Sequence, residues 1–211
     1  KNMIIEQYGL TYIRVNELDL ETLRYWRNQS YIRNTMQYKE YITPKMQIKW
    51  FHNMNNKFNY YFIIHHNHKK IGLINCKDTS VNSKIAEGGI FIWDKNYWGT
   101  SIPVYASLSM LQAVFDIFQS GDASLATVAI ENKIALDFNL KLGYEIQEKT
   151  SDGKYLKLYL SKEKYHIHCK KLLRAAELMS NNQSKFKLTA QVSPLQSDEI
   201  NKYIITSLSK P

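Results

Sequence analysis

The sequence is short of cysteine and of long apolar runs, and each shortage excludes a class of protein. Its two cysteines, Cys76 and Cys169, are far apart and fit neither a disulfide framework nor the spacing of a metal site. No window approaches the roughly 18–20 uninterrupted apolar residues of a membrane span. The first residues also lack the pattern of a secretory signal. We therefore expect a protein of the reducing cytoplasm that contacts no membrane and binds no metal.

Acidic residues are outnumbered by basic ones, 19 against 28, so the formal net charge is +9. Such an excess is typical of proteins that bind a polyanion, either a nucleic acid or a phosphate-rich cofactor, but it also occurs on a lysine-rich surface in solvent. The lysines are dispersed along the chain, and no nucleic-acid-binding motif is recognisable. We therefore expect no nucleic-acid partner.

Hydrophobic periodicity predicts a mixed α/β domain over residues 3–161 and a helical C-terminal extension over residues 162–211. Strands are expected at residues 10–15, at the edge of the sheet, and at residues 60–65, 71–76, 87–93, 125–130, 144–149 and 155–160; residues 87–93 are apolar on both faces and therefore central. Helices are expected at residues 20–29, 30–36, 44–54, 103–118 and 133–142, with Asp19, Thr43 and Asn132 as N-caps. The extension is expected to contain a helix over residues 163–179, a polar linker over 180–187 and a second helix opening at Ser193-Pro194.

The segment DKNYWGTSIP, residues 94–103, joins the central strand to a long apolar helix. The first amides of a helix have no intrahelical partner, and the helix dipole adds positive potential there, so such a junction suits a phosphate or diphosphate. Gly99 permits a tight path, Thr100 and Ser101 add hydroxyl groups, and Pro103 begins the helix. The alternative is an ordinary connection that Ser101 caps.

Three motifs carry a resemblance to a known family. The run from Asn96 to Ser101, which includes Tyr97, Trp98, Gly99 and Thr100, is similar to the cofactor loop of the GNAT N-acyltransferase superfamily, with Gly99 as the strict match. The segment from Asn132 through Phe138 to Tyr144 resembles a second GNAT motif. Trp26-Arg27-Asn28 with Arg33 resembles the branch that acetylates amino sugars of the pseudaminic-acid pathway; ribosomal-protein N-terminal acetyltransferases are near that branch.

The resemblance implies a mostly antiparallel central sheet flanked by helices, and acetyl-CoA as co-substrate. It places the pantetheine arm along the central strand at Phe91, Ile92 and Trp93, with a main-chain N–H near Ile92 as the oxyanion donor. It places the pyrophosphate on the amides of residues 97–101 and adds Asn96, Asn132 and Asn139 to the cofactor site. A bulge at Gly88-Gly89 is expected to open the slot for the thioester.

The resemblance leaves the acid and the base of the reaction open. Glu87 is the candidate base, unless it only ends the strand in solvent. Asn139 stands where many members have a tyrosine that protonates the leaving thiolate, and an amide cannot deliver a proton at neutral pH. Either Tyr97 or Tyr144 replaces that tyrosine, or the thiolate leaves with hydrogen-bond stabilisation alone, or catalysis is weak or absent.

The expected substrate is a small primary amine, most specifically that of a nucleotide-linked amino sugar, held by Trp26, Arg27, Asn28 and Arg33. The first alternative is an acetyltransferase of protein or peptide N-termini. The second is a binding protein that keeps the fold and has lost turnover. A homodimer is one expected assembly.

Overall fold

The computed structural model describes residues 3–56, 58–77, 84–181 and 183–189. These residues form a nine-stranded sheet in the order β7-β8-β6-β5-β4-β3-β2-β1-β9, in which all the pairs are antiparallel except β5 with β6. The strands are β1 (Ile4–Gln7), β2 (Leu10–Arg14), β3 (Tyr60–His66), β4 (Lys69–Lys77), β5 (Ile85–Ile92), β6 (Ala123–Ala129), β7 (Glu145–Lys149), β8 (Tyr155–Ser161) and β9 (Lys187–Thr189).

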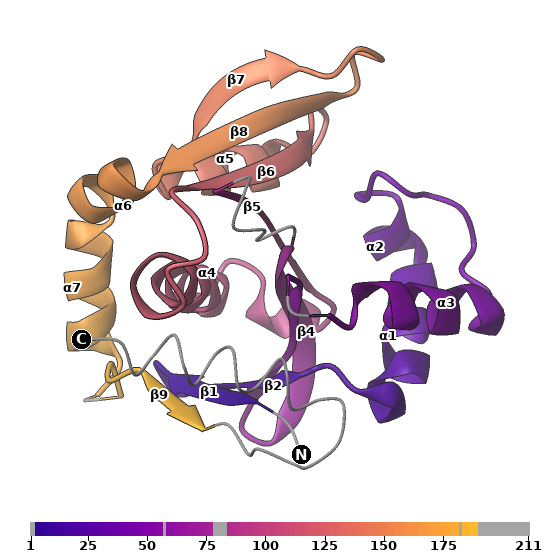
Figure 1. Cartoon of the computed structure of the whole chain (residues 1–211), viewed down its shortest axis with the longest axis horizontal. Coiled ribbons are helices and arrows are strands. Elements are labelled where there is room, and N and C mark those ends of the chain that lie inside the picture. Colours follow the sequence, from indigo (N-terminus) through magenta and orange to yellow (C-terminus); the bar gives the residue numbers. More distant parts are fainter. Residues whose placement is uncertain (1–2, 57, 78–83, 182, 190–211) are drawn as a thin grey trace.

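Helices cover both sides of this sheet. The sheet curves around α4, while α1, α2 and α3 lie together on the outer side of β4 and α6 and α7 close the open side near α4 (Figure 1). The helices are α1 (Leu20–Asn28), α2 (Ser30–Arg33), α3 (Pro44–Met54), α4 (Ile102–Gln112), α5 (Lys133–Lys141), α6 (Lys162–His168) and α7 (Lys170–Met179). A π-helical turn at Ala113–Ile117 continues α4. Within the described part of the chain, no helix is long and apolar enough to cross a membrane.

Two groups of buried apolar side chains hold the layers together. The larger group fills the space around α4 and reaches from Met3 in the first described segment to Ala176 in α7. Tyr12 and Phe115 belong to it and are almost fully buried, and the Tyr12 hydroxyl lies 3.1 Å from Ser109 Oγ of α4. The smaller group packs α1–α3 on the other face of β3, β4 and β5: Val15, Leu20, Leu23, Ile32, Phe51, Met54, Ile63, Leu73 and Trp93.

Most of the expected helices and strands are present, and the signals at their ends explain why they begin and stop there. The Thr43 side chain accepts a hydrogen bond from the Met46 N–H at the start of α3. The Asn132 side chain does the same for Ala135 in α5, and Gly143 follows that helix with φ +97°. Positive φ costs glycine little, which explains why α5 ends there.

Two expectations in the first part of the chain are wrong. β2 is not an edge strand, because β1 pairs with it and β9 pairs with β1. Asp19 precedes α1 but makes no capping hydrogen bond to it. Instead the Asp19 carboxylate accepts from the Asn16 N–H and pairs with Lys70 Nζ at 2.8 Å. Asn16 is the residue that caps, at the short 3-10 turn before α1.

The described residues of α6 and α7 pack against the rest of the chain. Tyr165, Cys169 and Ala176 are buried in the larger apolar group, so this segment shares the core of the preceding residues. The expected polar linker runs into β9, whose residue Leu188 pairs with Ile5 of β1. The helix expected from Ser193 lies outside the described residues. The division of the chain at residue 161 stays a prediction.

Candidate functional site

The strands β5 and β6 pair only at one end. Ile85, Ala86 and Glu87 align with Ala123–Leu125, and no pairing follows beyond Glu87. The register of β5 with β4, in contrast, continues without a shift to Ile92. The expected bulge at Gly88-Gly89 is therefore absent from the pairing with β4, but the expected separation of β5 from β6 is present. It leaves one edge of β5 without a partner strand.

A cavity of about 50 Å³ lies where the two strands separate. Gly88, Gly89 and Ile90 of β5 face Ser124 and Ala126 of β6 across it. A Cβ added at Gly89 would lie 2.8 Å from Asn75 Oδ1, and one at Gly88 would lie 3.4 Å from Ser124 Oγ, so larger residues would crowd this point. The polar side chains that line the cavity are Asn75, Ser107, Ser124, Asn139 and Tyr144.

Two predicted catalytic residues, Asn139 and Tyr144, line this cavity. The Tyr144 hydroxyl is buried and lies 2.7 Å from Ser124 Oγ. Burial raises the pKa of Tyr144, although the Ser124 hydrogen bond opposes this, so the phenol keeps its proton and remains a hydrogen-bond donor. Asn139 Nδ2 donates to the Ala135 carbonyl of its own helix at 2.8 Å, which uses part of its donor capacity.

The main chain of Ile92 faces the same gap. Successive residues of a strand direct their main-chain groups to opposite edges. The Trp93 N–H donates to the Ile71 carbonyl of β4 at 3.0 Å, so the N–H and carbonyl of Ile92 point away from β4. That carbonyl accepts a hydrogen bond from Trp98 Nε1 at 2.8 Å. The side chains of Phe91 and Trp93 pack instead with the smaller apolar group, and Trp93 Nε1 donates to the Lys70 carbonyl.

The loop between β5 and α4 offers fewer free amides than the sequence suggested. The N–H groups of Tyr97, Trp98 and Thr100 donate to carbonyls three residues earlier in the chain. Asn96 N–H donates to the Asp94 side chain. Ser101 is the N-cap residue of α4 but its side chain makes no capping hydrogen bond, whereas Thr100 Oγ1 accepts from the Ile102 N–H. Among the described residues, the N–H groups of Gly99, Ser101 and Val104 have no hydrogen-bond partner.

Gly99 explains how the chain makes this turn. It has φ +73°, and no atom lies within 4 Å of the position that a Cβ would take. The backbone is therefore open to a ligand at this residue, and any side chain there would be strained. Asn132, the remaining predicted cofactor residue, uses its side-chain oxygen as the N-cap of α5. The cofactor roles of these residues stay predictions.

Glu87 lies at the last position where β5 pairs with β6. It is inside the strand, which begins at Ile85, and its carboxylate pairs with Lys77 Nζ at 2.8 Å, so it does not merely end a strand in solvent. Both side chains are about one-third exposed, 36% for Lys77 and 31% for Glu87. The carboxylate is thus next to the point of strand separation and accessible from solvent.

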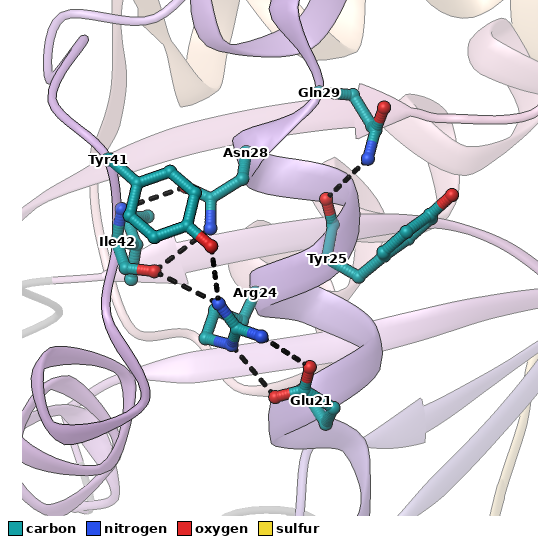
Figure 2. Close-up of polar contacts among 7 residues, drawn as sticks. All are labelled: Glu21, Arg24, Tyr25, Asn28, Gln29, Tyr41 and Ile42. Atoms are coloured by element: carbon teal, nitrogen blue, oxygen red, sulfur yellow. Dashed lines mark hydrogen bonds and ion pairs between the residues drawn. The ribbon is translucent and has the colours of Figure 1, made fainter.

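The four predicted substrate residues have different surroundings. Trp26 stacks on Trp93, the residue after β5, with ring centroids 5.9 Å apart, and the Arg27 guanidinium lies 5.8 Å from the ring centroid of Phe91 in β5. Asn28 is tied to the chain before α3: its Nδ2 donates to the Ile42 carbonyl, and its Oδ1 accepts from the Ile42 N–H (Figure 2). Arg33 ends the short helix α2. The structure therefore gives Asn28 a structural role in addition to any substrate contact.

The family that this geometry suggests is found by comparison with known proteins. A family model described as the acetyltransferase (GNAT) domain matches residues 10–145. The chain belongs to the GNAT acetyltransferase family. No curated protein matches it closely enough to count as a relative. As a GNAT acetyltransferase it uses acetyl-CoA. The match does not distinguish the amino-sugar branch from the ribosomal-protein branch.

Solved structures of other proteins, among them two acetyltransferases, share the fold. Spermidine N-acetyltransferase from Vibrio cholerae, in complex with CoA and spermine, is 18% identical with a TM-score of 0.63, over 75% of this chain and 98% of that one. Aminoglycoside acetyltransferase AAC(6')-Ib in complex with coenzyme A is 15% identical with a TM-score of 0.63, over 75% of this chain and 98% of that one. A domain from Methanocaldococcus jannaschii is 21% identical with a TM-score of 0.62, over 76% of this chain and 99% of that one. At these identities the likeness concerns the fold alone.

Sequence reasoning missed several residues of the site. Asn75, Ser107 and Ser124 line the cavity, yet no motif singles them out, because they come from three separate elements. Ser124 follows no recognisable pattern and acquires its role only through the contact with Tyr144. Within the described ranges, no three His, Cys, Asp or Glu side chains are grouped as metal ligands would be.

Proposed function

We propose that this GNAT enzyme acetylates the primary amine of a nucleotide-linked amino sugar, with the reacting groups meeting where β5 separates from β6. The observation that carries the proposal is the unpaired edge of β5 beyond Glu87, beside a cavity lined by Tyr144, Ser124 and Asn139. An extended arm can add to such an edge through main-chain hydrogen bonds, as a further strand would. The branch resemblance of Trp26-Arg27-Asn28 supports the amino sugar.

The residues present fit acetyl-CoA at this edge. Acetyl-CoA, when bound, supplies the thioester acyl group. The Ile92 N–H is directed into the gap and is the donor for the oxyanion, in accord with the general value of preorganised amides for developing charge. The free N–H groups of Gly99, Ser101 and Val104 lie at the start of α4, where main-chain donors and the helix dipole favour a diphosphate.

Tyr144 assists the leaving sulfur as a hydrogen-bond donor. Its pKa is raised by burial, whereas a free thiol has a pKa near 8.5. Proton transfer from the phenol to a thiolate would therefore be uphill, but donation of a hydrogen bond is not. Of the outcomes left open by Asn139, this favours departure of the thiolate with hydrogen-bond stabilisation.

Glu87 is the base that accepts a proton from the amine, directly or through water. Only a neutral amine has the lone pair needed to attack, and a sugar amine is less basic than lysine, whose pKa is about 10.4. The ion pair with Lys77 fixes the carboxylate next to the point of strand separation. It leaves one oxygen of Glu87 available on a partly exposed face.

The first test combines binding and turnover. A ligand that binds only the folded chain stabilises it by about 2.7 kcal/mol at a concentration of 100 Kd, so CoA is expected to raise Tm. Acetyl-CoA turnover is then measured with a nucleotide-linked amino sugar and with a panel of peptides. Turnover of the sugar nucleotide supports the proposal, whereas turnover of peptides alone favours N-terminal acetylation. A rise in Tm without turnover of any amine favours a binding protein, and the expected homodimer is checked by sedimentation of the same sample.

A further inference from the structure

Two arginines one turn apart on α1 have opposite surroundings. All three guanidinium nitrogens of Arg24 donate hydrogen bonds (Figure 2). Its Nε and Nη2 donate to the Glu21 carboxylate at 2.8 and 2.6 Å, and its Nη1 donates to the Tyr41 hydroxyl at 3.2 Å and to the Ile42 carbonyl at 3.4 Å. Arg24 therefore links α1 to the chain that leads into α3, and its charge has a counter-ion.

Arg27 has no such partners. Its Nη1 is shielded from water and makes no hydrogen bond, and no ion pair of Arg27 is found in the described part of the chain. Its described contact is with the Phe91 ring, 5.8 Å away. Burial lowers the pKa of Arg27, which is the sign of a charge that has lost water without gaining a counter-ion. Such a charge is costly unless a ligand pairs with it.

The position of Arg27 connects it with the transfer site. Phe91 follows Gly89 on β5, in the part of the strand that β6 has left. Phe91 and Trp93 project to the α1 side of the sheet, whereas Ile90 and Ile92 pack on the α4 side. The Arg27 guanidinium therefore lies on the face of β5 from which an acceptor can approach the gap without passing through the larger apolar core.

An independent observation comes from the residue next to Arg27. Trp26 lines a hollow of about 600 Å³, a size that suits a small ligand. The hollow is basic: its other lining residues are Lys69, Lys70, Trp93, Asp94 and Lys95. Lys70 is paired with Asp19 and Lys95 lies 4.2 Å from the Tyr31 ring centroid, whereas Lys69 has no polar partner among the described residues. Its one acid, Asp94, accepts from the Asn96 N–H.

We propose that the acceptor amine carries an acidic group, a phosphate or a carboxylate, that pairs with Arg27, and that polyamines are poor acceptors. Arg27 presents a planar fork that matches either anion. The lysines of the hollow take further negative charge of a larger acceptor. The inference rests on the proposed function in one respect, since it assumes an amine acceptor at the β5 gap. It separates this chain from the spermidine enzyme that shares its fold.

The experiment compares acceptors that differ by one group. The panel contains a free amino sugar, its 1-phosphate, the corresponding amino uronic acid, a nucleotide-linked amino sugar and spermidine. We expect the wild-type kcat/KM to be at least about tenfold higher for the phosphate or the uronic acid than for the free sugar. In Arg27→Gln the value for the acidic acceptor should fall about 10- to 100-fold, the range for a hydrogen bond to a charged group, and by clearly more than the value for the free sugar, so that the preference for the acidic acceptor is lost.

Matched variants separate the contact from the charge. Arg24→Gln removes the same charge from the same helix and should keep the preference for acidic acceptors. Arg27→Lys keeps a charge without the fork and should lose part of the preference, and it replaces Arg27→Gln if that variant does not fold. The inference is overturned if the wild type prefers spermidine or the free sugar, or if Arg27→Gln keeps the preference.

Binding distinguishes this failure from failure of the proposed function. If no amine of the panel is acetylated, the proposed function is wrong, and calorimetry with the amino-sugar 1-phosphate then tests Arg27 alone. A Kd that rises about 10-fold or more in Arg27→Gln and not in Arg24→Gln supports the anion contact. Equal affinity in all variants, or no binding to the wild type, overturns it. The phosphate and uronic-acid arms show which anion is preferred.

Discussion

The two faces of the central sheet differ in what they bury. On the side of α4, apolar side chains from both ends of the described chain form one continuous group, and α4 is buried along almost its whole length. On the side of α1–α3 the apolar group is smaller, and charged groups lie beside it, including Arg27, the pair Lys70–Asp19 and the pair Lys77–Glu87. The α4 face thus buries the larger share of the apolar side chains, while the α1 face, where we propose that the acceptor binds, keeps charged groups beside its apolar residues.

The largest expected effect is the loss of stability when a buried side chain on the α4 face is truncated. Phe115 is fully buried and its ring centroid lies 5.1 Å from that of Tyr165, so Phe115→Ala should lower the free energy of unfolding by about 3–5 kcal/mol. Phe91→Ala removes a half-buried ring on the α1 face and should cost clearly less stability while lowering acetyl transfer. Urea denaturation and initial rates check both variants. Equal losses of stability would contradict the division between the two faces.

An intermediate effect is expected where the two faces meet at the strand gap. Tyr144→Phe removes the hydroxyl that lines the cavity and should lower kcat about 100-fold, the usual effect of losing one donor to a developing charge. Tyr97→Phe removes a hydroxyl that contacts His66 Nδ1 at 3.1 Å, outside the cavity lining, and should change kcat little. Steady-state kinetics decides, and a larger loss in Tyr97→Phe would assign the role to Tyr97.

The smallest expected effect is a change in the pH dependence of stability, and it tests whether the α4 face excludes water from the Cys169 thiol. Burial raises the pKa of the Cys169 thiol to about 11. Above about pH 9 the thiol ionises in the unfolded chain but not in the folded one, so its contribution to stability falls with rising pH, by up to about 1.4 kcal/mol per unit until the folded pKa is reached. Below that window it contributes no slope. Cys169→Ala should therefore flatten the unfolding free energy between pH 9 and 11, and an unchanged slope in denaturation curves would contradict this.

The sequence predicts the fold where its signals are local. Thr43 before Pro44 and Asn132 before α5 cap their helices as expected, because each cap needs only the next three residues. The short strand β9 could not be foreseen, because its three residues become a strand only by pairing with β1, far away in the sequence. The same missing information turned β2 from an expected edge strand into an interior one.

The site shows a similar limit. A family motif identified Tyr144 as a candidate, and Tyr144 lines the cavity. Its partner Ser124 could not be identified in this way, because the contact between them depends on how β6 lies beside Tyr144. The loop amides were expected to be free because helix starts leave donors unpaired. The 3-10 turn at Lys95–Tyr97 uses Trp98 N–H locally, and spacing alone does not reveal such a turn. The contrast between Arg24 and Arg27 likewise requires knowledge of which neighbours each side chain meets.

The pairing of β9 with β1 also has a consequence for biosynthesis. Ile5 emerges from the ribosome among the earliest described residues, whereas its partner Leu188 is made among the latest. Until then the hydrogen-bonding edge of β1 is exposed and can pair with another chain, which is a recognised route to aggregation. Completion of this sheet therefore waits until β9 has been synthesised, and the β1–β2 hairpin is the segment that a holding chaperone has most reason to protect.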